Sequence, residues 1–334
     1  MEQKFFGKLS DGSDVTLYTI KGDNTSVEIM SRGATIVRFI AFGTDIVAGF
    51  DTLQGFVEDT ASYQGALIGR VGNRVKNAIF TMDGVDYKLY NNDGNHSLHG
   101  GHYGFNTKNW TLISHTENSL TLAYTSPDGE EGYPGTVYTE VVYSLIGDSL
   151  MIEYMAKSDR KTPISLTNHS YFNLNGISGT ILSHEAEIYA DSITEVGSDL
   201  IPNGNHPSVR GTVFDFNERR TIGKFVGKDF DGYDHNYILN PKESGEFMGA
   251  SLPLVAKFYG DKIEMDVYTD QPCAQLYTGN YLADMTFKGG VPAIKHGAFC
   301  FETQIEPNSI NHGIGIYDHT DTYSHKVVYS VKEK

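Results

Sequence analysis

Residues 79–90 read Ile79-Phe80-Thr81-Met82-Asp83-Gly84-Val85-Asp86-Tyr87-Lys88-Leu89-Tyr90. Two short runs with β-branched and aromatic side chains flank Asp83-Gly84. An Asp-Gly pair favours the type I′ turn, because the twist of that turn matches the twist of two adjacent antiparallel strands. The stretch therefore predicts a tight antiparallel hairpin.

The same alternation of apolar and polar residues recurs along the chain. Residues 110–115 with 119–124 predict a second hairpin, and residues 137–145 with 149–155 predict a third. Further strands are expected at residues 15–20, 27–30, 33–37, 163–171, 185–190, 262–269, 274–278, 298–305 and 326–331. Only residues 218–225 predict a short helix. Many short strands separated by turn residues predict an all-β protein, a large antiparallel β-sandwich or a barrel.

The chain reads as one domain. Its 334 residues suit a large all-β fold, and no linker, low-complexity tract or internal repeat divides them. We therefore expect a single domain over residues 1–334. Three longer irregular stretches, residues 51–78, 91–109 and 195–235, are where loops are expected to build a cleft.

Composition argues against several classes of protein. The chain has 26 Lys and Arg against 42 Asp and Glu, a formal net charge of −16. This field repels nucleic acid and anionic lipid, although such acidity also serves solubility alone. No run approaches the roughly 20 apolar residues that span a bilayer, and the N-terminus lacks the apolar core of a signal peptide. We expect a cytoplasmic protein without nucleic-acid or membrane partners. Pairing of Cys273 with Cys300 stays open, with free thiols as the default.

Two glycine-containing segments carry cationic and imidazole side chains. The first reads Gly69-Arg70-Val71-Gly72-Asn73-Arg74. Its glycines allow close approach to a ligand, and an arginine fork can donate to two oxygens at once; the alternative is a turn with solvated arginines. The second segment, residues 95–102, holds three histidines in a region that does not read as helix, namely His96, His99 and His102. This spacing is poor for a metal site, so a single functional histidine is favoured and no metal is expected.

Residues 163–171 place a histidine on a polar strand face. Alternation puts Leu166 on one face, and on the other it puts Ser165, Thr167, His169 and Tyr171. A histidine there can act as an acid near neutral pH. The alternative is a structural histidine bonded to a backbone carbonyl.

Residues 299–305 place a carboxylate among aromatic side chains. Phe299, Phe301, Thr303 and Ile305 share one face of this expected strand, and Cys300, Glu302 and Gln304 share the other. Burying a carboxylate is costly without partners. Glu302 is therefore a candidate general base with a raised pKa.

The segment Asp231-Gly232-Tyr233-Asp234-His235-Asn236-Tyr237 joins acidic and amide groups at a turn. A carboxylate can accept two hydroxyl hydrogens of a sugar. An Asx-turn, in which the side chain bonds its own backbone, is an equally common reason for such residues.

In this order along one chain, these segments resemble the aldose 1-epimerase (galactose mutarotase) family. The resemblance covers nearly the whole chain, starting near residues 33–36. It includes residues 69–74, 95–101, 128–135, 168–174, 233–236, 275–280 and 301–304. The strings Leu98-His99-Gly100-Gly101 and Asn168-His169-Ser170-Tyr171-Phe172-Asn173-Leu174 are specific in combination. Ser170 is the one local variation.

The resemblance implies the large antiparallel β-sandwich called the galactose mutarotase-like supersandwich. By motif, Glu302 resembles the catalytic base, His169 the catalytic acid and His99 the second active-site histidine. The sugar-binding positions correspond to Arg74, Asn73, Asp234 and, less closely, Gln275. Arg70 is the alternative arginine. His96 and His102 resemble neighbours of the site.

The implied function is an isomerase of carbohydrate metabolism that interconverts the α and β anomers of free aldoses such as D-galactose and D-glucose. In this chemistry Glu302 takes the proton of the C1 hydroxyl while His169 gives one to the ring oxygen. No cofactor or metal is needed. The expected partner is a monosaccharide, and the expected assembly is a monomer or homodimer.

Three alternatives remain open on sequence. A hexose-6-phosphate 1-epimerase needs a cationic pocket for the phosphate. Only Arg70 and Arg74 could supply that positive charge. A non-catalytic sugar-binding module is disfavoured by the presence of Glu302, His169 and His99. A glycosidase would have to pair Glu302 with Asp234 across the scissile bond.

Overall fold

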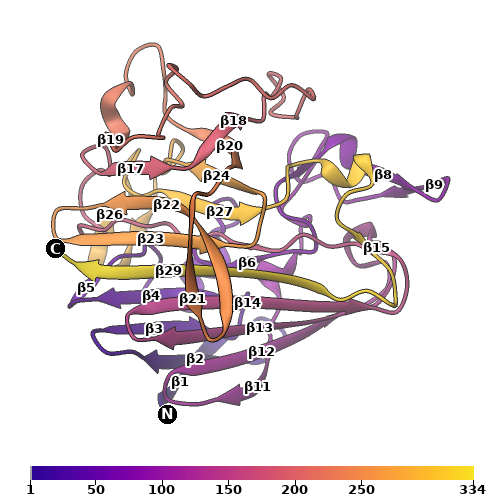
Figure 1. Cartoon of the computed structure of the whole chain (residues 1–334). Helices are drawn as coiled ribbons and strands as arrows, with labels where there is room; N and C mark the ends of the chain where they lie inside the picture. The colour runs from indigo at the N-terminus through magenta and orange to yellow at the C-terminus, as the bar shows by residue number, and fades with distance from the viewer. Residues whose placement is uncertain (1) are drawn as a thin grey trace.

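The computed structural model describes residues 2–334, and two antiparallel sheets dominate it (Figure 1). The first has five strands in the order β1 (Glu2–Lys8), β2 (Asp14–Lys21), β3 (Thr25–Met30), β4 (Thr35–Ala41) and β5 (Thr44–Asp45). The second has ten strands. Its order is β11 (Thr111–His115), β12 (Ser119–Ser126), β13 (Val137–Ile146), β14 (Ser149–Ser158), β29 (Tyr323–Glu333), β23 (Ile263–Thr269), β22 (Ala250–Tyr259), β17 (Glu185–Ile188) and β19 (Arg220–Thr221), with β21 (Glu243–Phe247) paired to β22.

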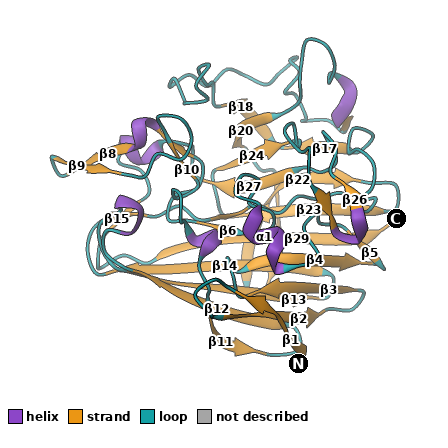
Figure 2. Cartoon of the chain, turned by 180° about the vertical axis from the view of Figure 1, so that it is seen from behind, coloured by secondary structure: helices purple, strands orange, loops and turns teal. Residues whose placement is uncertain are grey.

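A third sheet of four strands adds another layer. Its order is β18 (Ala190–Ile193), β20 (Asp234–Leu239), β24 (Cys273–Tyr277) and β27 (Cys300–Gln304). Phe299 and Phe301 bring this layer against the ten-stranded sheet, with ring centroids 4.4 and 5.3 Å from that of Phe258 on β22. Figure 2 shows that long loops surround this sheet, whereas the opposite part of the molecule is mostly strand.

One core joins the three sheets. Its buried side chains include Ile20 and Phe39 from the first sheet, Val141 and Ile152 from the second, and Leu276 from the third. Full burial of one such side chain contributes roughly 1.5–3 kcal/mol. The predicted all-β antiparallel sandwich is therefore confirmed.

Short pairs and turns complete the fold. The two-stranded pairs are β6 (Leu67–Ile68) with β16 (Thr167–Asn168), β7 (Arg74–Val75) with β10 (Ser97–Leu98), β8 (Ile79–Met82) with β9 (Val85–Lys88), β15 (Thr162–Pro163) with β28 (Ile316–Tyr317), and β25 (Thr286–Phe287) with β26 (Val291–Pro292). The helical segments are α1 (Leu53–Glu58) and six 3₁₀ turns, η1 (Lys76–Ala78), η2 (Phe105–Thr107), η3 (Glu130–Gly132), η4 (Ile222–Lys224), η5 (Lys288–Gly290) and η6 (Ser309–His312).

Between β8 and β9, Asp83 and Gly84 both have positive φ, 52° and 78°, as a type I′ turn requires.

Two predictions, at residues 218–225 and 185–190, are wrong because of how these segments join the sheets. The helix expected at residues 218–225 is only the 3₁₀ turn η4, because Arg220 and Thr221 pair with β17 and so take part in the sheet. The strand expected at 185–190 divides at Tyr189. There β17 ends its pairing with β22, and β18 begins to pair with β20 in a different sheet. Sheet pairing overrides local pattern in both cases.

Within residues 2–334, no helix combines the length and apolar character that crossing a membrane requires. Cys273 and Cys300 are both buried and free. They lie at opposite ends of two paired strands, because Cys273 faces Gln304 and Cys300 faces Tyr277.

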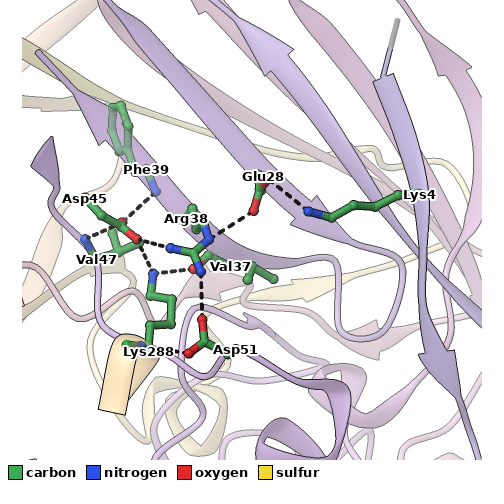
Figure 3. Close-up of polar contacts among 10 residues, drawn as sticks. Lys4, Glu28, Val37, Arg38, Phe39, Asp45, Val47, Asp51 and Lys288 are labelled. Atoms are coloured by element: carbon green, nitrogen blue, oxygen red, sulfur yellow. Dashed lines mark hydrogen bonds and ion pairs between the residues drawn. The ribbon is translucent and has the colours of Figure 1, made fainter. Parts of the chain in front are cut away.

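A buried ion pair connects the first sheet to the segment that follows β25 (Figure 3). Lys288 is 2% exposed. Its Nζ donates to Asp45 Oδ2 at 2.7 Å and to the Val37 carbonyl at 2.6 Å. Arg38 also bonds Asp45, at 3.2 Å, and Asp51, at 2.8 Å. Burial lowers the pKa of Lys288, and Asp45 opposes that shift.

The Asp45→Asn variant is expected to lower the free energy of unfolding by about 3 kcal/mol, because it leaves the Lys288 charge buried without its partner. Chemical denaturation measures this value. Asp51→Asn is the matched control, since the Asp51 side chain is 50% exposed and its loss is expected to cost under about 1 kcal/mol. Equal losses in the two variants would contradict this account.

Candidate active site

The four-stranded sheet presents three of the predicted site residues. Gln275 on β24 lies directly opposite Glu302 on β27. Asp234 starts β20 and pairs with Tyr277 of β24. Alternation turns Phe301 into the core while its neighbour Glu302 faces the other way, as the sequence pattern predicted. One face of this sheet is therefore core and the other carries the polar groups.

Two glycine-containing segments bring Asn73, Arg74 and His99 to the same place. Leu98 of β10 pairs with Arg74 of β7. Gly100 has φ +88°, and a Cβ there would lie 1.9 Å from the Gly69 carbonyl oxygen. Only glycine permits this approach.

Three non-glycine residues at the site have left-handed backbone conformations. They are Tyr63, Asn73 and His99, with φ of 54°, 60° and 53°. Such conformations are unfavourable for residues other than glycine and tend to gather at functional sites.

His169 reaches the site from an irregular segment, so the continuous strand predicted at 163–171 is wrong. Only Thr162–Pro163 and Thr167–Asn168 pair with other strands. The Oδ1 atom of Asn168 accepts hydrogen bonds from the backbone N–H and the hydroxyl of Ser170, and this local turn ends the strand. Residues 162–174 are all buried, so neither side of this segment faces solvent.

All of the predicted site residues line one cavity of about 170 Å³. They are Asn73, Arg74, His99, His169, Asp234, Gln275 and Glu302. These side chains come from positions up to 229 residues apart, from 73 to 302, so tertiary structure alone brings them together.

Hydrogen bonds fix the polar wall of this cavity. The Asn73 amide donates to Gln275 Oε1 at 3.3 Å, and the Gln275 amide donates to Asp234 Oδ1 at 2.7 Å. Arg74 Nε donates to Asp93 Oδ2 at 2.7 Å. Because the Asp234 carboxylate only accepts, it fixes the orientation of the Gln275 amide, which in turn fixes that of the Asn73 amide.

Glu302 and His169 lie deep in the cavity, 2% and 5% exposed. The Glu302 Oε1 and His169 Nε2 atoms are 3.7 Å apart. The other carboxylate oxygen, Oε2, is buried and has no hydrogen-bond partner among the described residues. It is available to accept a hydroxyl hydrogen of a bound molecule.

Burial controls the protonation of these groups. It raises the pKa of Glu302 well above 4.5, with Asp234 adding to the shift and Arg74 opposing it. It lowers the pKa of His169 to about 4, and it lowers that of His99 well below 6.5, helped by His169 and Arg74. It also raises the pKa of Asp234. The charged form of each group is costly in this environment.

His99, His169 and Glu302 offer potential ligand atoms within 4.8 Å of one another. The hydrogen bonding of His99 is unsuited to a metal, however. Its Nδ1 atom accepts the backbone N–H of Asn73 at 3.2 Å. A neutral imidazole then carries its proton on Nε2, which leaves no lone pair there for coordination. The arrangement suits proton transfer and hydrogen bonding.

Comparison with known proteins agrees with this geometry. The family model described as aldose 1-epimerase matches residues 16–330. The chain belongs to the aldose 1-epimerase family. It is 40% identical over 318 residues to the galactose mutarotase of Bos taurus, covering 92% of this chain and 90% of that one. It is 34% identical over 314 residues to the aldose 1-epimerase of Escherichia coli K12, with coverage of 90% and 89%.

Solved structures of similar proteins share the fold. The GalM/aldose epimerase homologue from C. elegans superposes with a TM-score of 0.87 at 29% identity, covering 95% of this chain and 98% of that one. The galactose 1-epimerase from Lactobacillus acidophilus NCFM gives the same TM-score at 23% identity, covering 99% of each chain.

Within this aldose 1-epimerase fold, the two candidate arginines differ in position. Arg74 lines the cavity. Arg70 is buried elsewhere, where its guanidinium donates to Ser126 Oγ and to the carbonyl oxygens of Ser126, Pro127 and Pro134, all at 2.8–3.1 Å. Arg70 therefore holds the loop around residues 126–134.

The other two histidines of the second segment do not line the cavity. His96 Nδ1 accepts the backbone N–H of Asn77, and the exposed His102 stacks on Tyr90. The structure therefore separates His99 from its two neighbours in sequence, as predicted.

Motif resemblance identifies none of the tyrosines that line the cavity. Tyr63 packs against the rings of His99 and His169, with centroid distances of 4.8 and 5.8 Å. Tyr277 and Tyr281 line the cavity as well, and Tyr281 is 76% exposed. The place of Tyr277 is predictable from the sequence, because alternation along the strand puts it on the same face as Gln275. Tyr63 sits in an irregular stretch that carries no periodic signal.

The Arg70→Met variant is expected to lower the free energy of unfolding by about 3 kcal/mol or more, because several buried carbonyl oxygens lose their donors. Thermal or chemical denaturation measures the change. The matched variant Arg74→Met breaks an ion pair with the partly exposed Asp93 and is expected to cost about 1 kcal/mol. A larger loss of unfolding free energy in Arg74→Met than in Arg70→Met would contradict the structural role assigned to Arg70.

Proposed function

We propose that the protein catalyses mutarotation, the interconversion of α and β anomers of free aldoses such as D-galactose and D-glucose. The observation that carries the proposal is the buried pair of Glu302 and His169, with facing atoms 3.7 Å apart in a cavity. A carboxylate and an imidazole so close together can remove one proton and deliver another within a single bound sugar.

In the proposed reaction Glu302 takes the proton from the C1 hydroxyl. His169 gives a proton to the ring oxygen as the bond between C1 and that oxygen breaks. The product is an open-chain aldehyde, whose C1–C2 bond rotates before the ring closes on the other face. Ring closure reverses both transfers, so no proton is gained or lost overall.

The protonation states fit this cycle. Before ring opening, the pair is Glu302 carboxylate with His169 imidazolium; afterwards both are neutral. Burial favours the neutral pair, whereas their mutual attraction favours the charged pair. Both pairs hold the same number of protons, so the cycle needs no exchange with solvent.

Substrate binding is assigned to the remaining polar wall. Asp234 and Gln275 are suited to accept and donate hydroxyl hydrogen bonds, and Arg74 can donate to sugar oxygens. Asn73 orients Gln275 and supports His99 through its backbone N–H. His99 is assigned a hydrogen bond to the sugar from Nε2. Tyr63 supplies an apolar wall.

A phosphorylated sugar is a poorer fit. Among the described residues, Arg74 is the one arginine that lines the cavity, and it is already paired with Asp93. The carboxyl groups of Asp234 and Glu302 share the same cavity, so a phosphate there would meet like charge.

The proposal also covers the cellular location, the domain organisation and the assembly of the protein. Free buried thiols at Cys273 and Cys300 fit the reducing cytoplasm. One domain over residues 1–334 is supported by a core cluster that runs from Tyr18 to Val331. Assembly as a monomer or homodimer stays a prediction.

Polarimetry tests the activity directly. Fresh solutions of crystalline α-D-galactose and α-D-glucose are expected to reach their usual equilibrium rotation faster with the protein than without it. Glu302→Gln is expected to lower kcat by at least about 10²-fold, since a positioned acid–base group contributes about 10²–10⁴-fold.

His169→Asn is expected to give a loss of the same order, and Cys273→Ala, away from the cavity, serves as a folded control. Absence of acceleration with either sugar would exclude the proposal. Acceleration with glucose 6-phosphate alone would replace it with phosphosugar epimerisation.

The pH profile of kcat/KM is expected to be a bell with a broad plateau. The active pair holds one proton, so activity falls on the acid side when a second proton binds. Because burial lowers the pKa of His169 to about 4, this fall is expected as the pH drops through about 4. Activity falls on the alkaline side when the pair loses its remaining proton. Polarimetry with subtraction of the spontaneous rate measures the profile; an acid midpoint near 6.5 would contradict the assignment.

A further inference from the structure

A row of aromatic rings runs from the catalytic pair to the open end of the cavity. The Tyr171 ring packs on that of His169, with centroids 5.1 Å apart. Tyr277 follows at 6.0 Å from Tyr171, and Tyr281 stacks on Tyr277 at 6.4 Å. All four rings line the cavity. His169 and Tyr171 are 5% and 2% exposed, whereas Tyr281 is 76% exposed. The row therefore connects the floor of the cavity, at His169, with its mouth, at Tyr281.

The backbone of Tyr281 is anchored although its side chain is exposed. Its N–H donates to the hydroxyl of Tyr277 at 3.0 Å. The next residue, Leu282, is 1% exposed and belongs to a buried cluster that includes Phe287 and Ala298. The exposed ring is thus held at the mouth by its neighbours in the chain. Aromatic rings that line a cavity beside a few fixed polar groups are typical of small-molecule sites.

The chemistry of the pyranose ring decides which atoms of the sugar meet this mouth. In the six-membered ring, C4 lies opposite C1, and C3 lies opposite the ring oxygen. The C1 hydroxyl and the ring oxygen react at Glu302 and His169, which are 2% and 5% exposed on the floor. The C3–C4 side of the sugar therefore points toward the mouth and Tyr281. Galactose and glucose differ only at C4.

We propose that Tyr281 is a specificity-determining residue whose ring contacts the C3, C4 and C5 hydrogens of the sugar and so favours galactose over glucose. In galactose the axial C4 hydroxyl leaves these three hydrogens on one face of the ring, whereas in glucose the C4 hydrogen points to the other face. The face of an aromatic ring is negative and attracts such hydrogens. The inference deepens the mutarotase function proposed above and rests on it.

The first test compares the two sugars in polarimetry at several sugar concentrations. Tyr281→Ala is expected to raise KM for galactose about tenfold and KM for glucose by less than about threefold, the size of one lost aromatic contact and a part of it. The kcat values are expected to change little, because the proton transfers take place at the floor. Tyr281→Phe keeps the ring and is expected to keep both KM values.

A matched control is available at Tyr90. This tyrosine is 56% exposed and stacks on His102 outside the lining of the cavity. Tyr90→Ala removes an equally large exposed ring and is expected to leave KM for both sugars unchanged. Equal increases in the two KM values of Tyr281→Ala, or no increase in either, would overturn the inference.

The second test measures the contact without turnover. In protein with ¹³C-labelled tyrosine rings, the NMR signals of Tyr281 are the ones that Tyr281→Phe lacks. Saturating galactose is expected to shift these signals, and saturating glucose is expected to shift them less. Tyr281 signals that stay in place under saturating galactose would overturn the inference, even in an enzyme that accelerates mutarotation.

The two tests also separate this inference from the function. If galactose shifts the Tyr281 signals more than glucose does, but the wild-type protein fails to accelerate mutarotation, then the sugar contact stands and the catalytic function is excluded. If the wild-type protein is active and the Tyr281 signals do not respond, the function stands and the role of Tyr281 is excluded.

Discussion

Glu302 and His169 are buried against each other in a place where an isolated charge on either side chain is costly. The charged form of either group is less costly when the other carries the opposite charge, because the two attract each other across 3.7 Å. The rest of the site follows from this constraint. The ring of His169 must be held at a fixed distance from the carboxylate, and neighbouring polar groups must already be satisfied so that they do not compete for the proton.

The fold meets this requirement with one strand that has two different faces. On β27, Phe301 packs on Phe258 of the ten-stranded sheet, while Glu302 and Cys300 face His169. The position of the carboxylate is therefore as rigid as the core behind it. The loops around residues 63, 73 and 99 complete the cavity with left-handed backbone conformations. These conformations cost energy, which the surrounding packing offsets.

Much of this arrangement could be predicted from sequence. The Asp83-Gly84 hairpin and the alternation at residues 299–304 depend on local pattern, which is visible in the chain itself. The members of the site came from motif resemblance, which reports residues that function together even when they lie far apart in sequence. What failed was decided by tertiary contacts. Residues 163–171 cross the interior without a long partner strand, and residues 220–221 join a sheet although their local pattern favours a helix. Tyr63 gave no signal because its role depends only on where its loop is held.

Lys288, whose polar contacts Figure 3 shows, has a consequence for the outer wall of the cavity. Leu282 and Met285 line that wall and Tyr281 stands at its exposed edge, only a few residues before the amine that bonds Asp45 and Val37 in the first sheet. The wall is thus attached to the first sheet through a buried ion pair. Loosening of the first sheet, by heat or denaturant, is expected to reach this wall of the cavity directly, so that loss of activity accompanies the earliest fraying of the N-terminal strands and precedes unfolding of the core.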